Sequence, residues 1–171
     1  IPQGLETGID IQGLKAMEKA LVEIGKEVGA KKATGMMTSA LRDGAKEFED
    51  TMRKDAPESE FNRIVKTKSG SKVEIRPGFL KSRIKVRAST NRKANVTRKF
   101  GKNVVSLVKA GVFKVPYIVQ VEYGTSRTKQ KPFIRNSFRK KKQASVTVIN
   151  RRLARKIKLA QNRIAKKYQS K

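Results

Sequence analysis

The sequence predicts an α+β fold in which an antiparallel β-meander of three to four strands packs with two N-terminal helices and a long C-terminal helix. Apolar residues recur at helical spacing near both ends of the chain, and β-branched residues alternate with polar ones in its middle. Gly and Pro separate these segments. Because 171 residues are one domain's worth, we expect residues 1–171 to form a single domain.

Two amphipathic helices are expected in residues 1–57. The first runs from about residue 10 to residue 29, and the second from about residue 34 to residue 56, where Pro57 ends it. The apolar stripe of the first helix is Leu14, Met17, Leu21, Ile24 and Val28. The buried face of the second is Met37, Leu41, Phe48 and Met52.

The middle of the chain reads as β-structure. Residues 58–76 are expected to insert a basic β-hairpin, because two alternating segments flank Ser69-Gly70-Ser71. Residues 77–125 are expected to hold the sheet, and its strands are placed at 80–88, 103–110 and 115–123. A polar loop of five bases and no acid fills residues 89–102.

The last helix is expected over residues 132–168, opened by Pro132. Its apolar residues from Ile149 to Tyr168 are spaced by three or four positions. The β-branched run at residues 146–148 leaves open a kink or break near residues 140–148. The segment is predicted either to reach a neighbouring molecule as a long helix or to fray as a basic tail.

The charge is concentrated in the second part of the chain. The sequence holds 42 Lys and Arg against 14 Asp and Glu, a net charge of +28, and residues 61–171 contain only two acids, Glu74 and Glu122. Such a surface repels itself unless an anion is nearby. The candidate anions are nucleic acid, an acidic protein partner and a membrane face, and the remaining alternative is a merely basic surface.

Several classes of site are excluded by composition. The chain has no Cys and no His, which excludes thiolate zinc sites, zinc fingers and histidine bases. Its acids are not clustered as metal-dependent hydrolysis requires, and no uncharged stretch is long enough to span a bilayer. We therefore expect no catalysis, no cofactor, no metal and no membrane segment.

Any contact with nucleic acid is expected to be to phosphates, because no base-reading module is recognisable. The basic hairpin, the loop 89–102 and the last helix supply the candidates. The bases expected to face DNA or an acidic partner are Lys66, Lys68, Lys72, Arg92, Lys93, Arg98, Lys99, Lys102, Arg139, Lys140, Lys141, Lys142, Arg151, Arg152 and Arg155.

Two neighbouring stretches carry a more specific pattern. They are Val119-Gln-Val-Glu122-Tyr123-Gly124-Thr125-Ser126 and Lys131-Pro132-Phe133-Ile134-Arg135-Asn136-Ser137-Phe138. This pair resembles the tail-completion proteins of tailed bacteriophages, also called head–tail joining proteins or minor tail components. Ala56-Pro57 and the run from Pro77 to Val86 resemble a second motif of that family, with Pro77 in place of Thr. The hairpin insertion is not expected from the family.

The resemblance implies a virion structural protein of the phage neck, assembled in the cytoplasm of the bacterial host. It implies a hexameric ring that completes the tail and joins it to the head around the DNA channel. The implied partners are further copies of the chain, head-completion, adaptor or stopper proteins, tail terminator or tail tube proteins, and double-stranded DNA. The alternative is a sequence-independent nucleic-acid-binding, packaging or ribosome-associated protein.

Physical roles can be given to the residues of the main motif. Gly124 is expected to supply a backbone angle that other residues avoid, Thr125 to bond the turn and Phe133 to anchor the last helix on the sheet. Glu122, an acid among bases, is expected to pair with Arg135. The motif residues Glu122, Tyr123, Gly124, Thr125, Pro132, Phe133 and Arg135 either only shape the fold or, with the loop 124–131, also form a subunit contact.

Overall fold

The computed structural model describes residues 14–58, 62–66, 69–90 and 106–169. It confirms the α+β class and the long C-terminal helix. The described elements are α1 (Leu14–Val28), α2 (Ala30–Asp55), β1 (Arg63–Lys66), β2 (Lys72–Ile75), α3 (Phe79–Ser82), β3 (Ile84–Thr90), β4 (Ser106–Val112), α5 (Ile118–Tyr123) and α6 (Phe133–Gln169).

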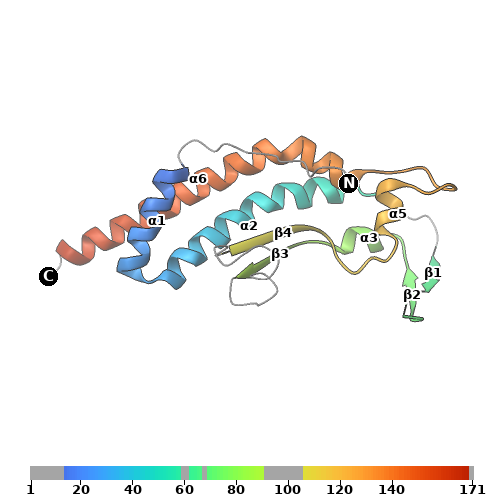
Figure 1. Cartoon of the computed structure of the whole chain (residues 1–171), viewed down its shortest axis with the longest axis horizontal. Helices are drawn as coiled ribbons and strands as arrows, with labels where there is room; N and C mark the ends of the chain where they lie inside the picture. The colour runs from blue at the N-terminus through green and yellow to red at the C-terminus, as the bar shows by residue number, and fades with distance from the viewer. Residues whose placement is uncertain (1–13, 59–61, 67–68, 91–105, 170–171) are drawn as a thin grey trace, which may run out of the picture.

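The elements form an elongated, layered arrangement along α6 (Figure 1). Helix α2 lies between α6 and the β3–β4 pair, and it contacts both. Helix α1 crosses the C-terminal part of α6, whereas α3, α5 and the β1–β2 hairpin lie at the opposite end of the molecule (Figure 1). Gly29, at φ 94°, makes the turn between α1 and α2, a backbone angle that favours glycine.

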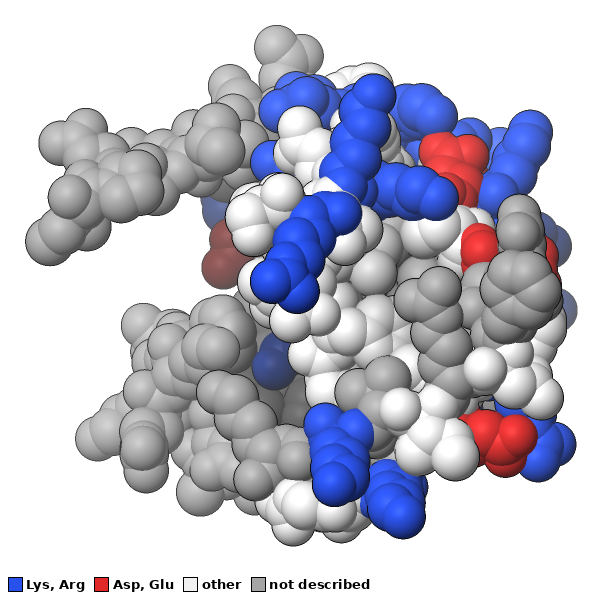
Figure 2. Space-filling model, turned by 90° about the vertical axis from the view of Figure 1, so that its right-hand side faces the viewer, with Lys and Arg blue, Asp and Glu red and all other residues white. Residues whose placement is uncertain are grey.

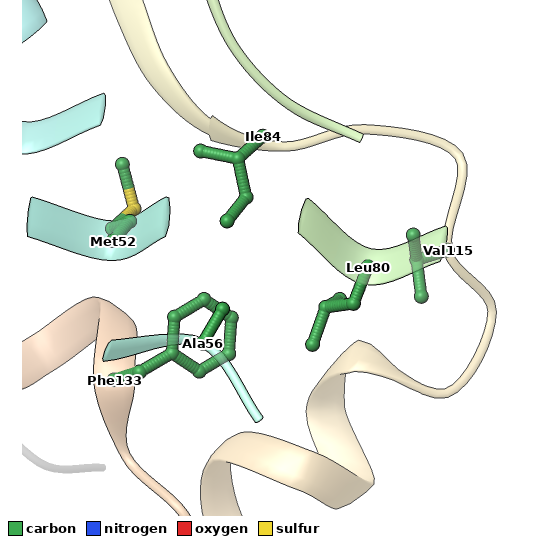
Figure 3. Packing of buried hydrophobic residues seen from close by; sticks show 6 residues of the cluster. All are labelled: Met52, Ala56, Leu80, Ile84, Val115 and Phe133. Atoms are coloured by element: carbon green, nitrogen blue, oxygen red, sulfur yellow. The ribbon is translucent and has the colours of Figure 1, made fainter. Parts of the chain in front are cut away.

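One hydrophobic core joins the C-terminal end of α2 to the start of α6 (Figure 3). Its buried residues come from five parts of the chain and include Phe133 of α6, which is 3% exposed. They are Met52, Ala56, Leu80, Ile84, Val115 and Phe133. The expectation that Phe133 anchors the last helix is therefore confirmed.

A second core lies where α1, α2 and α6 meet. Its buried members are Leu21, Ile24, Ala40, Leu153 and Ile157. The helical stripes found in the sequence of α1 and α6 supply four of these five residues. Periodicity predicts these positions because a helix buries one face against its neighbours.

The expected single meander is replaced by two separate antiparallel pairs, β1 with β2 and β3 with β4. The expected β-hairpin is confirmed, with Lys66 opposite Lys72 at its closed end. The strand expected at 80–88 begins only at Ile84, because Gly78 at φ 76° starts the helical turn α3 first. The strand expected at 103–110 corresponds to β4, and residues 103–105 of the expected strand lie outside the described part. Of the loop expected at 89–102, Ser89 and Thr90 instead belong to β3, because they pair with Leu107 and Ser106 of β4, and the rest lies outside the described part.

The strand expected over residues 115–123 is wrong. Residues 115–117 form a turn, and Ile118–Tyr123 form the short helix α5. Pro116 lacks the N–H that a strand ladder requires, and the amide of Gly124 closes the helix by donating to the carbonyl of Gln120 at 2.8 Å. Tertiary contacts of Glu122, described below, override the β propensity of the Ile and Val residues.

Helix α6 is continuous through residues 140–148, where the sequence left a kink open. Its buried Ser145 and its Ile149 lie against Gly44 of α2, where even a Cβ atom would overlap Ile149. The close packing of two helices thus offsets the weaker helix propensity of the β-branched run. Interior Gly residues in helices commonly mark such close approaches.

Candidate functional site

The two halves of the main sequence motif meet in one hydrogen-bonded unit, which we name the Glu122 clamp: Glu122, Tyr123 and Arg135 with the amide of Ile134. The side chain of Glu122 is almost fully buried, at 4% exposure of the residue. Its Oε2 accepts the amide N–H of Ile134 at 3.1 Å, and its Oε1 accepts the amide N–H of Arg135 at 2.9 Å. Glu122 therefore caps the N-terminus of α6, where a carboxylate is favoured.

Arg135 closes the clamp from the other side. Its guanidinium donates from Nε to Oε1 of Glu122 at 3.2 Å and from Nη2 to the carbonyl of Glu122 at 2.8 Å. The guanidinium also lies over the ring of Tyr123, 4.4 Å from its centroid, a favourable cation–π geometry. The expected Glu122–Arg135 pair is thus confirmed.

The loop 124–131 is held by a side-chain hydrogen bond within it and by a backbone hydrogen bond to α5. Gly124 adopts φ 77°, and a Cβ there would come within 2.9 Å of the amide of Gln130 and the carbonyl of Thr128. The Oγ1 of Thr125 accepts the amide of Thr128 at 3.0 Å, and the amide of Lys131 donates to Val121 at 2.8 Å. The expected turn roles of Gly124 and Thr125 are confirmed.

Pro132 stands directly before α6, and its carbonyl accepts the amide of Asn136 at 3.1 Å. A Pro at a helix start loses no hydrogen bond. Together with the burial of Phe133, this gives every residue of the motif a role in shaping the fold. The side chains of the loop residues 125–131 are nevertheless exposed, so the loop is also open to a partner.

Apolar side chains beside this loop are exposed as well. Val119 and Tyr123, one turn apart on α5, are each 63% exposed. Residues four apart on a helix share a face, so these two side chains form a small exposed apolar surface beside the loop. The end of the molecule that carries α5 shows Lys and Arg gathered at two edges with uncharged residues between them (Figure 2).

The basic candidates on α6 fall into two groups. The helix has 13 bases and no acid, and α2 supplies acids to one flank of it. Lys140 pairs with Asp55, Lys141 with Glu47 and Arg152 with Asp43. Within the described part of the chain no acid pairs with the other predicted bases of this helix, which are the exposed Arg139, Lys142, Arg151 and Arg155.

Further unpaired bases on α6 lie outside the predicted set. In the described residues no carboxylate lies within ion-pair distance of Lys156, Lys158, Arg163 or Lys166. Lys156, Arg163 and Lys167 line a groove with Lys32 of α2. The sequence signal was present as bases along α6, but only the fold brings Lys32 beside them.

The hairpin candidates lie far from this helix face. Lys66 and Lys72 are exposed and directly opposite each other, a like-charged pairing that a bound anion would relieve. At the end of β2, the hydrogen bond and charge of Arg76 lower the pKa of Glu74, and Glu74 raises the pKa of Arg76. The remaining predicted bases lie outside the described residues: Lys68, Arg92, Lys93, Arg98, Lys99 and Lys102.

The acids of the described residues are dispersed. No three of them come close enough together to hold a metal ion. Nor does any described helix have the length and apolar character needed to cross a membrane.

Comparison of the chain with protein-family models, curated proteins and solved structures finds no match.

Proposed function

We propose that the protein is a structural component of a tailed-phage neck, which forms an oligomeric ring that completes the tail and joins it to the head around the DNA channel. The Glu122 clamp carries this proposal. The two sequence stretches that resemble the tail-completion motif lie together in one hydrogen-bonded unit, in which the start of α6 donates to Glu122. In this proposal the protein acts by binding and carries out no catalysis.

The same unit supports a subunit contact. The loop 124–131 directly follows α5, which carries the exposed pair Val119 and Tyr123. Backbone hydrogen bonds hold the loop to α5 and to the start of α6. A neighbouring copy seated there would cover the apolar pair. Neighbouring rings with acidic surfaces, or DNA, would neutralise the unpaired bases of α6.

Ring formation is expected to depend on salt in a characteristic direction. Subunits of net charge +28 repel one another, and salt screens this repulsion over a Debye length of about 8 Å at physiological ionic strength. Mass photometry or analytical ultracentrifugation between low and moderate salt should therefore show more assembly as salt is added. The expected product is a closed ring, visible by negative-stain microscopy.

Two matched variants test the subunit contact. Val119→Asp on α5 is expected to abolish rings, whereas Val22→Asp on α1 is expected to leave them intact, because both side chains are exposed but only Val119 adjoins the loop. Circular dichroism should show both variants folded. Rings that form equally well in both variants would remove α5 from the contact, and a monomer under all conditions would contradict the neck assignment.

A second function, sequence-independent binding of nucleic acid, is favoured by the unpaired bases of α6. It predicts the opposite salt response, because binding that releases counterions weakens as salt rises, with a slope of about −0.9 per phosphate neutralised. Arg151→Ala with Arg155→Ala should then make that slope shallower by about 2. A monomer whose duplex affinity falls this way supports the second function.

A further inference from the structure

A groove of about 600 Å³ lies between the C-terminal half of α6, the start of α2 and the end of α1. Its volume is within the range of ligand sites, roughly 300–1,000 Å³. The half-buried side chains of Met36, Ala160 and Ile164 contribute apolar surface to it. This groove is separate from the Glu122 clamp, which lies at the other end of α6 (Figure 1).

The rim of the groove is strongly basic. Lys32, Lys156, Arg163 and Lys167 line it, against a single acid, Glu27. Glu27 is already engaged, since its Oε2 accepts the hydroxyl proton of Tyr168 at 2.7 Å. That hydrogen bond and the charge of Glu27 raise the pKa of Tyr168. An occupant therefore meets Lys32, Lys156 and Arg163 around an apolar floor, with one carboxylate, Glu27, at the rim.

A basic rim around an apolar floor fits an acidic peptide better than duplex DNA. A DNA duplex is a convex rod whose phosphates carry no apolar group to place on Met36 and Ile164. An acidic peptide segment brings both parts, carboxylates for the rim and an apolar side chain for the floor. Complementary charge also speeds and orients such an encounter.

We propose that this groove binds an acidic segment of a partner protein, with an apolar side chain of that segment seated between α2 and α6. The proposal stands apart from the neck assignment, because it concerns a site within one copy of the chain. It gives the basic half of α6 a protein partner with carboxylate groups.

Gly35 allows the groove to be blocked without a change of charge. It lines the groove on α2, and a Cβ added there meets no atom within 4 Å. Gly35→Phe should therefore fold and fill the groove. The probe is a short labelled peptide in which Asp and Glu flank one Leu and one Ile, measured by fluorescence anisotropy on the full chain. Micromolar binding is expected, weakened at least about tenfold by Gly35→Phe.

Two double variants that remove equal charge separate the groove from general attraction. Lys32→Ala with Arg163→Ala should weaken peptide binding about fivefold or more, and Arg151→Ala with Arg155→Ala, outside the groove, should weaken it by less than about twofold. A peptide with Ser in place of Leu and Ile should bind more weakly than the parent.

Three results would overturn the proposal. They are equal binding by the parent and Ser peptides, unchanged peptide binding by Gly35→Phe, and loss of duplex DNA binding in Gly35→Phe while the peptide does not compete with DNA. The last would make the groove a nucleic-acid site. None depends on whether the chain forms rings, so failure of this proposal and failure of the neck assignment are distinguishable.

Discussion

Replacing Glu122 by Ala is expected to lower the free energy of unfolding by about 3 kcal/mol, the lower end of the cost of breaking a buried ion pair. The change removes the acceptor of two backbone N–H groups at the start of α6 and leaves Arg135 without its carboxylate. The lower end applies because the side chain of Arg135 is 39% exposed, so water can solvate it. Urea unfolding followed by circular dichroism measures the loss.

Two further variants identify the cause. Glu122→Gln keeps one oxygen acceptor but not the charge, and should cost about half as much, since hydrogen bonds to charged groups contribute roughly 1.5–3 kcal/mol. Glu58→Gln breaks the exposed pair with Lys81 and should cost less than about 1 kcal/mol. If Glu122→Ala costs no more than Glu58→Gln, the carboxylate does not organise the start of α6.

The helical part of the fold follows from local sequence because amphipathic helices carry their periodicity with them. The stripe containing Leu21 and Ile24 predicts the buried face of α1, and the stripe containing Leu153 and Ile157 predicts that of α6. These positions need no knowledge of the partner element, since a helix buries one face whatever covers it. The hairpin is also predictable locally, because its turn residues and its two alternating strands are adjacent in the sequence.

The failures come from interactions between distant segments. Ile118, Val119 and Val121 have strand propensity, yet they belong to a helix whose Glu122 bonds the start of α6. Strand propensity is context-dependent and spans about 1 kcal/mol per residue, a local preference that tertiary contacts such as those of Glu122 override. The pairing with Arg135 was predictable from charge, but the helical conformation that it accompanies was not.

The candidate surface divides in the same way. Exposed bases such as Arg151 and Arg155 could be identified from the sequence alone, because Lys and Arg side chains are rarely buried without a partner. The groove required three helices to converge, so Lys32 could not be placed beside Arg163 from sequence. The ion pair between Lys140 and Asp55 also links residues far apart in the chain, so it could not be predicted from sequence either.

Adding one methyl group at Gly44 is expected to destabilise the protein by about 2 kcal/mol, within the 1–3 kcal/mol typical of overpacking. A Cβ at this position would overlap Ile149 and come within 2.9 Å of the carbonyl oxygen of Ser145. The helices α2 and α6 would have to move apart along their shared contact. For a chain of this length the melting temperature should fall by roughly 4–8 °C.

Gly35→Ala is the matched control, because it adds the same methyl group to the same helix. Its Cβ meets nothing within 4 Å, so the substitution should instead stabilise by about 0.5–1 kcal/mol through helix propensity. If Gly44→Ala lowers the free energy of unfolding and Gly35→Ala raises it, the difference measures close packing separately from helix propensity.

A double variant tests the contact itself. Ile149→Ala in the Gly44→Ala background removes the side-chain overlap but not the approach to Ser145. Its loss of stability should therefore be smaller than the sum of the losses of the two single variants. Additive losses, or stabilisation by Gly44→Ala, would show that α2 and α6 do not approach this closely.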